Sequence, residues 1–213
     1  SSLCGKSILI VGSMANNMGK AIIELALHGG VANIYATAKQ KHWKTLISFG
    51  VMPLSPEPND WITRLEGTID LVLASNGGLR EDITPIHFRA LRPKTGRLIM
   101  CGRRVVGNDV PVGDSEQTPL TLACAKQKAA TKMMNYSYAY NVYDHWERNL
   151  DLCKRDLQHL LTLLQQGVIQ PKILDRIPLD KVMRAHEMLE SKRLSGFLIC
   201  EPWMKSKKRA LYL

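Results

Sequence analysis

The chain has 213 residues, 45% of them hydrophobic, which suits one folded domain with a small appendage and argues against a disordered protein. No apolar run approaches the roughly 20 residues of a membrane-spanning helix, and we expect no membrane partner. The formal charge of +10 would permit a nucleic-acid partner. Nucleic acid is not expected, because no aromatic residues interleave with the basic ones and part of the charge lies in a tail of Lys205, Lys207, Lys208 and Arg209.

The first apolar run, Ile8 to Val11, meets a turn of small residues and then a segment with apolar residues at helical spacing. Strand, glycine turn and helix begin a nucleotide-binding βαβ unit, where a phosphate lies against unpaired N–H groups of the helix. The full glycine code is G-x-G-x-x-G, whereas Gly12 and Gly19 here enclose a stretch without glycine. Asn16 stands where a glycine would allow the closest approach to a pyrophosphate, so the pattern predicts the fold more strongly than the ligand.

Strands and helices continue to alternate after Gly29-Gly30, which ends the first helix. Strands are predicted at residues 33–38, 51–54, 69–74 and 97–101. A helical piece is expected to place Trp43, Leu46 and Ile47 on one face, a short helix with Trp61, Ile62 and Leu65 to be capped by Asn59 or Asp60, and residues 85–91 to be helical.

The second half of the chain has a loop-like stretch at 105–117, a helix at 118–129 and an edge strand at 131–138. One long helix is predicted over 144–167, then a strand at 172–177, a helix capped by Asp180 and a strand at 197–200. The apolar stripe of the long helix consists of Trp146, Leu150, Cys153, Leu157, Leu160, Leu161 and Leu164. Together these elements predict an α/β fold, a doubly wound parallel sheet with right-handed crossovers and a C-terminal helix/strand extension.

The five cysteines are widely spaced and form no CxxC pair or Cys/His cluster, so no structural zinc site or other metal site is predicted. Their odd number and apolar neighbours favour a reducing compartment. An intracellular, cytoplasmic location is therefore expected.

Six segments occur in an order that resembles the cofactor-binding half of the medium-chain dehydrogenase/reductase family, particularly its zinc-free quinone oxidoreductase and enone reductase branch. The segments are ILIVGSMANNMG, NIYATAKQKHWKTLISFGV, IDLVLASNGG, ALRPKTGRLIMCG, LLQQGVIQP and IPLDKVMRAHEMLESKRLSGFLI. The resemblance implies a Rossmann fold with NAD(P)H at the carboxyl edge of the sheet, and hydride transfer to a substrate held against an N-terminal domain that this chain lacks.

The same resemblance divides the chain into a dinucleotide-binding domain (1–144), a segment that packs on the absent substrate domain (145–204) and a basic tail (205–213). It implies part of an NAD(P)H-dependent oxidoreductase, inactive without that domain and with a small-molecule substrate in the full-length protein. It also implies a homodimer through the strand at 131–138, since an exposed edge strand needs a partner.

Candidate cofactor contacts fall at three strand ends. In the family the first turn reads A-x-x-G-x-x-G, and its counterpart here is Ser13-x-x-Asn16-x-x-Gly19. The turn residues are Ser13, Met14, Asn16, Asn17, Met18 and Gly19, with the N–H groups of Asn17 and Met18 facing a phosphate. By resemblance Asn76, Gly77, Cys101 and Gly102 lie beside the nicotinamide, although Asn76-Gly77 is equally well explained as turn chemistry.

The choice of dinucleotide depends on the stretch after the second strand. Between Glu24 and Glu57 there is no acidic residue to hold a ribose 2′-hydroxyl. Thr37, Lys39 and Lys41 offer a hydroxyl and cations instead, which suits the 2′-phosphate of NADPH over NADH. The alternative is that these lysines only solvate the start of a helix.

No catalytic residue is identified, and a Tyr35-x-x-x-Lys39 match to short-chain dehydrogenases falls on the wrong element and is a chance match. The competing hypothesis is a degenerate Rossmann module that acts as a binding or scaffold domain. A methyltransferase is disfavoured, because the acid that would hold an adenosine ribose is missing.

Overall fold

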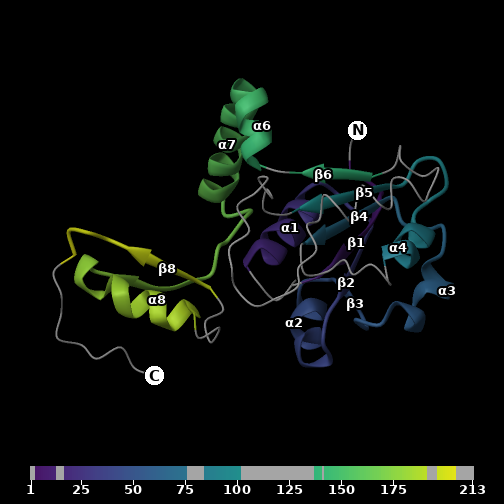
Figure 1. Cartoon of the computed structure of the whole chain (residues 1–213), viewed down its shortest axis with the longest axis horizontal. Coiled ribbons are helices and arrows are strands. Elements are labelled where there is room, and N and C mark those ends of the chain that lie inside the picture. The colour runs from purple at the N-terminus through teal and green to yellow at the C-terminus, as the bar shows by residue number, and fades with distance from the viewer. Residues whose placement is uncertain are drawn as a thin grey trace, which may run out of the picture.

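The computed structural model describes residues 3–12, 17–75, 84–101, 137–140, 142–190 and 196–204. Within these ranges a six-stranded sheet stands beside a smaller two-stranded one (Figure 1). All neighbours in the large sheet are parallel, in the order β3-β2-β1-β4-β5-β6. The strands are β1 (Ser7–Val11), β2 (Asn33–Thr37), β3 (Met52–Leu54), β4 (Leu71–Ser75), β5 (Arg97–Cys101) and β6 (Ser137–Tyr140). The predicted doubly wound parallel sheet is confirmed.

The central strand β1 is buried on both faces, which explains its uninterrupted apolar sequence. Ile8 and Ile10 pack in one cluster with Ile23 of α1 (Asn17–His28), and this cluster includes Leu46 of α2 (Trp43–Ser48). Leu9 and Val11 face the opposite side. The second cluster lies under α3 (Ile62–Leu65) and α4 (Thr84–Ala90) and includes Trp61, Ile62, Leu65, Ala90 and Leu91.

Two details of the predicted helices are wrong. In α2 only Leu46 is buried and Ile47 is exposed, because the helix has just six residues and turns one side chain to the sheet. The residue before α3 is Trp61, and no side chain caps the helix. Asn59 and Asp60 are instead part of a 3₁₀ turn, η2 (Pro58–Asp60), which begins at the proline. Another 3₁₀ turn, η1 (Gln40–His42), precedes α2.

The predicted helix over 144–167 is in fact two helices, α6 (Val142–Arg148) and α7 (Leu150–Gln165), which stand out from the large sheet in Figure 1. The backbone of Asn149 leaves helical geometry between them (φ −139°, ψ 50°). The predicted stripe is not a core within the described part of the chain. Only Cys153 of that stripe is buried, together with Leu163, whereas the other six stripe residues are exposed.

A small βαβ unit follows, which we call the C-terminal module: β7 (Ile173–Ile177), η4 (Leu179–Lys181), α8 (Val182–Glu190) and β8 (Phe197–Cys200). Both strands were predicted, and they pair in parallel. The predicted cap at Asp180 is wrong, because this residue lies inside η4 and no side-chain cap bond forms. Gly196 is required where β8 approaches β7, since a Cβ there would lie 2.5 Å from Leu174 Cγ.

The outer strand β6 covers residues 137–140, so the predicted edge strand at 131–138 is described only in its last two residues. The predicted loop at 105–117 and helix at 118–129 lie outside the described residues, as does the basic tail. Across the described ranges, no helix combines the length and apolar character needed to cross a membrane.

Candidate functional site

The carboxyl ends of the parallel strands lie at one edge of the large sheet. Val11 pairs with Ala74, and Ser75 pairs with Cys101. The strand order reverses between β1 and β4, which have crossovers to opposite sides. In open α/β sheets ligands bind at the edge where this reversal occurs. The geometry therefore places the candidate site at the ends of β1, β2, β4 and β5.

The turn after β1 is tied to the end of β2. Gly12 has a φ of 107°, a conformation that favours glycine, and its N–H donates to Thr37 Oγ1 at 3.4 Å. The side chain of Thr37 is buried, since the residue is only 7% exposed. Thr37 therefore positions the glycine turn, a role that its place in the sequence did not reveal.

Helix α1 begins at Asn17, at the same edge of the sheet. Met18 is exposed and Gly19 is buried against the body of the domain. The first N–H groups of a helix lack partners within the helix and carry the positive end of its dipole, which favours an anion. No acidic residue lies in the first turn to oppose one. This helix start fits the phosphate of a dinucleotide.

Lys39 and Lys41 follow β2 on an anchored loop. The N–H of Ala38 donates to Leu54 O at 3.0 Å, and Trp43 Nε1 donates to Ala38 O at 2.8 Å. Both lysines are exposed, so their ammonium groups lie in solvent beside the end of β2. Their placement fits a phosphate at the sheet edge.

Several predicted site residues are not among the residues that the structure describes. Ser13, Met14, Asn16, Asn76, Gly77 and Gly102 lie outside the described residues, and Cys101 is described only as the last residue of β5. The residues that the structure brings to one edge are Asn17, Met18, Gly19, Thr37, Lys39, Lys41 and Cys101.

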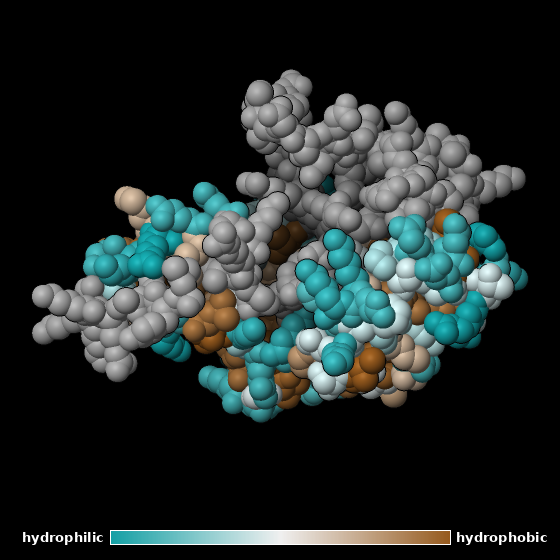
Figure 2. All heavy atoms as spheres, turned by 90° about the horizontal axis from the view of Figure 1, so that it is seen from below, coloured by the Kyte–Doolittle hydropathy of each residue, from teal (hydrophilic) through white to brown (hydrophobic). Residues whose placement is uncertain are grey.

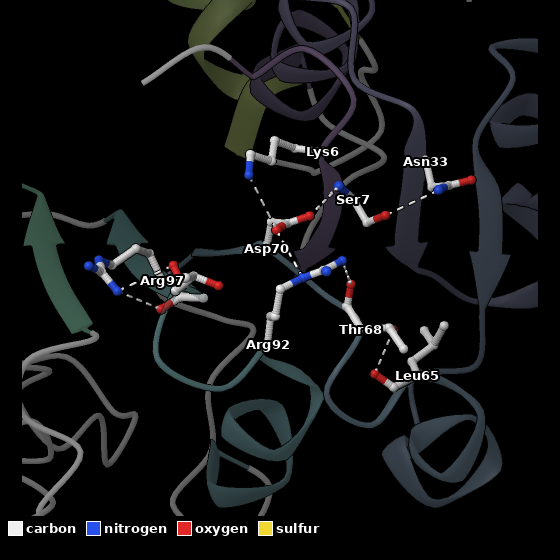
Figure 3. Close-up of polar contacts among 10 residues, drawn as sticks. Lys6, Ser7, Asn33, Leu65, Thr68, Asp70, Arg92 and Arg97 are labelled. Atoms are coloured by element: carbon white, nitrogen blue, oxygen red, sulfur yellow. Dashed lines mark hydrogen bonds and ion pairs between the residues drawn. The ribbon is translucent and has the colours of Figure 1, made fainter.

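The opposite edge carries a charged network that the sequence analysis missed (Figure 3). Asp70 precedes β4, and its carboxylate accepts from the Ser7 N–H at 2.9 Å and pairs with Arg92 Nε at 3.1 Å and Lys6 Nζ at 3.7 Å. The Asp70 side chain is 12% exposed. The sequence did contain one indication of this network, because Asp70 is an acidic residue directly before an apolar strand. This network joins β1 to β4 at the edge away from the candidate site.

A scan against protein-family models matches residues 56–199, well over half of the chain, to a family described as zinc-binding dehydrogenases. The chain belongs to this dehydrogenase family. The match confirms the predicted resemblance to medium-chain dehydrogenase/reductases and supports a nucleotide-binding oxidoreductase domain. The family implies a nicotinamide dinucleotide as the cofactor.

Solved structures of such dehydrogenases have the same fold. The enoyl reductase CurK is 20% identical with a TM-score of 0.63, covering 93% of this chain and 55% of its own. The quinone oxidoreductase from Coxiella burnetii is 19% identical with a TM-score of 0.59, covering 92% and 53%. The alcohol dehydrogenase TADH from Thermus sp. ATN1 is 22% identical with a TM-score of 0.59, covering 93% and 52%. This chain thus spans about half the length of the structures it matches. A search of curated proteins gives no match.

The family description names zinc, and the described residues can be searched for its ligands. In the ranges that the structure covers, no three His, Cys, Asp or Glu side chains gather where they would hold a metal ion. A zinc site needs three or four such ligands around one point. A dinucleotide phosphate does fit the described residues, because the start of α1 carries the positive end of the helix dipole and no acid lies in its first turn.

Proposed function

We propose that this chain is the NADPH-binding domain of a zinc-independent medium-chain oxidoreductase that transfers hydride to a quinone, an enone or a carbonyl compound. The observation that carries the proposal is the end of β2. Thr37 is buried against the glycine turn, exposed Lys39 and Lys41 follow it, and no acidic residue occurs between Glu24 and Glu57. Cations suit a 2′-phosphate, whereas NAD-specific domains hold the ribose 2′-hydroxyl with an acid.

In this proposal the bound cofactor supplies the hydride, and the protein binds and orients it. The N–H groups at the start of α1 hold the pyrophosphate, aided by the glycine turn that Thr37 fixes. Lys39 and Lys41 hold the 2′-phosphate. The residues at the ends of β4 and β5, among them Asn76, Gly77, Cys101 and Gly102, are proposed to flank the nicotinamide.

Zinc independence and the substrate class are supported by two observations. The cysteines of the chain are widely spaced, without a CxxC pair. Two of the similar structures are described as an enoyl reductase and a quinone oxidoreductase, and a third as an alcohol dehydrogenase. The first two descriptions favour reduction of activated double bonds or quinones. We also propose a cytoplasmic location, where the cysteines stay reduced.

The proposed division of the chain keeps a dinucleotide-binding domain at 1–144 and a segment at 145–204 that packs on a substrate domain. Large apolar side chains of this segment are exposed, including Met183 at 77% and Leu179 at 61%. Figure 2 shows hydrophobic residues reaching the surface among hydrophilic ones on one face of the molecule. Exposed apolar side chains of this size suit a contact with another protein surface. The similar structures have nearly as much chain again to provide it.

A homodimer is also proposed, through the outer strand of the large sheet. β6 pairs with β5 on one side only among the described strands, and its other edge is the end of the sheet. An edge strand offers unpaired backbone groups to a second copy. Gel filtration over a wide concentration range tests this, and a monomer mass at every concentration would rule it out.

Calorimetric titration of NADPH, NADH and NADP⁺ at two salt concentrations tests the cofactor proposal. We expect micromolar NADPH binding, much weaker NADH binding, and a loss of about tenfold for NADPH in Lys39→Gln, with the matched exposed lysine Lys94→Gln unchanged. Equal affinity for NADPH and NADH would overturn the preference.

If none of the three dinucleotides binds, Asn16→Gly separates two explanations. Recovery of binding in Asn16→Gly would mean that asparagine at position 16 blocks the turn. This is what the hypothesis of a degenerate scaffold domain expects. Continued absence of binding would point to a missing part of the site.

A further inference from the structure

Two charged residues of α1 contact the backbone of a residue far along the chain. Lys20 Nζ donates to the carbonyl oxygen of Gln170 at 2.5 Å, and the N–H of Gln170 donates to Glu24 Oε2 at 3.0 Å. Gln170 lies in the connection between α7 and β7, which Figure 1 shows leading into the C-terminal module. One ion pair thus satisfies both backbone polar groups of one residue.

The ion pair is anchored within the large-sheet unit. Lys20 Nζ lies 3.3 Å from Glu24 Oε1, and the two side chains are only 27% and 14% exposed. Lys20 Nζ also lies 5.9 Å from the ring centroid of Phe49, within the range of a cation–π contact. The Lys20 and Glu24 side chains are partly buried, whereas their bonds to Gln170 are exposed, and hydrogen bonds to charged groups are stronger than those between neutral groups. These contacts therefore favour one fixed geometry.

The order of the two charges is the opposite of what α1 alone would favour. Lys20 lies in the first turn of α1, near the positive end of its dipole, and Glu24 follows four residues later. An isolated helix is stabilised better with the acid first and the base second. The observed order matches Gln170 instead, since the base meets a carbonyl and the acid meets an N–H.

The connection is also held from the side of α7. The Gln170 side-chain amide donates to Gly167 O at 2.9 Å, and the Val168 N–H donates to Leu163 O at 2.9 Å. Strand β7 begins shortly afterwards, at Ile173. Gln170 is consequently fixed to α7 on one side and to α1 on the other.

We propose that Lys20 and Glu24 are positioning residues that clamp Gln170 and thereby hold the C-terminal module in one orientation relative to the large sheet. The same helix presents its N-terminus to the dinucleotide, so in the proposed reductase the clamp would fix the substrate-side segment relative to the cofactor. That consequence rests on the proposed function, whereas the clamp itself does not.

A charge swap, K20E/E24K, tests the clamp in the full chain. The swap keeps the net charge and the ion pair, and it gives α1 the charge order that an isolated helix prefers. At Gln170, however, it places a carboxylate against the carbonyl oxygen and an ammonium group against the N–H. We expect the amide hydrogen of Gln170 to exchange at least tenfold faster in K20E/E24K and in Glu24→Gln, with the amides of Ile23 and Ala26 unchanged. Residual dipolar couplings of α1 and α8 should fit one alignment in the parent and two in the swap.

The matched control is the exposed pair of Glu66 and Arg89, whose swap E66R/R89E should leave Gln170 unchanged. Gln170 exchange within twofold of the parent in both clamp variants, or a single alignment in the swap, would overturn the proposal. Failure of the parent chain to bind NADPH would count against the proposed function and leave these outcomes intact.

Discussion

In the large-sheet unit, Leu9 and Val72 are fully buried, whereas Met183 and Leu179 of the C-terminal module are mostly exposed. Both regions are built from parallel strands, although β7 carries Asp175 and Arg176 among its apolar residues. The difference lies in what covers them: β1 has apolar clusters on both faces, while in the described part of the module α8 and the short η4 accompany the two strands.

A two-stranded sheet is marginally stable unless something else packs on it. The comparison teaches that an apolar sequence marks a surface to be covered and does not say by which part of the protein. The large-sheet unit covers its own strands, whereas large apolar side chains of the module remain exposed. The following predictions test this contrast, in order of decreasing effect.

Truncation of a buried apolar side chain should separate the two regions most clearly. Leu9→Ala removes contacts in the core and should lower the free energy of unfolding by about 2–5 kcal/mol. Leu179→Ala, at an exposed position of the module, should change it by less than about 0.5 kcal/mol. Urea unfolding measures both, and equal losses would contradict the contrast.

Addition of a Cβ at a crowded glycine should also act differently in the two regions. In the large-sheet unit, a Cβ at Gly96 would lie 2.8 Å from the backbone of Arg92, and Gly96→Ala should cost about 1–3 kcal/mol of global stability. Gly196→Ala should speed amide hydrogen exchange in β8 and leave the free energy of global unfolding unchanged. A large global loss from Gly196→Ala would show that the module unfolds with the sheet.

Loss of the Asp70 charge should weaken the amino edge of the large sheet. Asp70→Asn removes a charged acceptor from Ser7, Arg92 and Lys6, and we expect a loss of about 1–3 kcal/mol by urea unfolding. NADPH affinity should not change, because the network lies at the opposite edge from the candidate site. An equally large loss in Lys94→Gln, which is exposed and outside this network, would show that the assay reports surface charge in general.

The smallest effect is expected from the exposed pair of Glu66 and Arg89. The hydrogen bonds and charge of Arg89 lower the pKa of Glu66 below its ordinary value of 4.5. A lowered folded-state pKa stabilises the protein above pH 4.5, and this stabilisation is lost as the pH falls through the folded-state value. Thermal melts from pH 3 to 7 should show a slightly shallower acid loss in Glu66→Gln. An unchanged profile would mean that solvent screens the pair completely.

Much of the large sheet could be predicted from sequence, because its strands are short apolar runs between clear turns. Residues 97–101 were predicted as a strand and form β5 with those bounds. The resemblance was read from the order of several segments, and the family match confirms it. Local sequence patterns are sufficient to predict a strand where it is an apolar run bounded by turn residues.

The errors occurred where position in space decides the outcome. Periodicity continued through Asn149, so one helix was predicted although the backbone bends there. The bond that Thr37 Oγ1 accepts from the Gly12 N–H, between residues 25 apart, was not predicted either, and the expected contact of Thr37 with a cofactor stays a prediction. The Lys20, Glu24 and Gln170 contacts join positions about 150 residues apart and leave no local pattern in the sequence. Such features depend on the assembled fold.

The position of β1 has a consequence for synthesis of the chain. Among the described strands of the large sheet it is made first, and it lies inside the finished sheet between β2 and β4. Ser7 bonds to Asp70, 63 residues later, so ribosomes adding about 5–20 residues per second leave one edge of β1 waiting roughly 3–13 s for β4. During that interval an apolar strand is exposed in the nascent chain. Chaperone capture of nascent chains should therefore peak before β4 emerges and fall once it can pair.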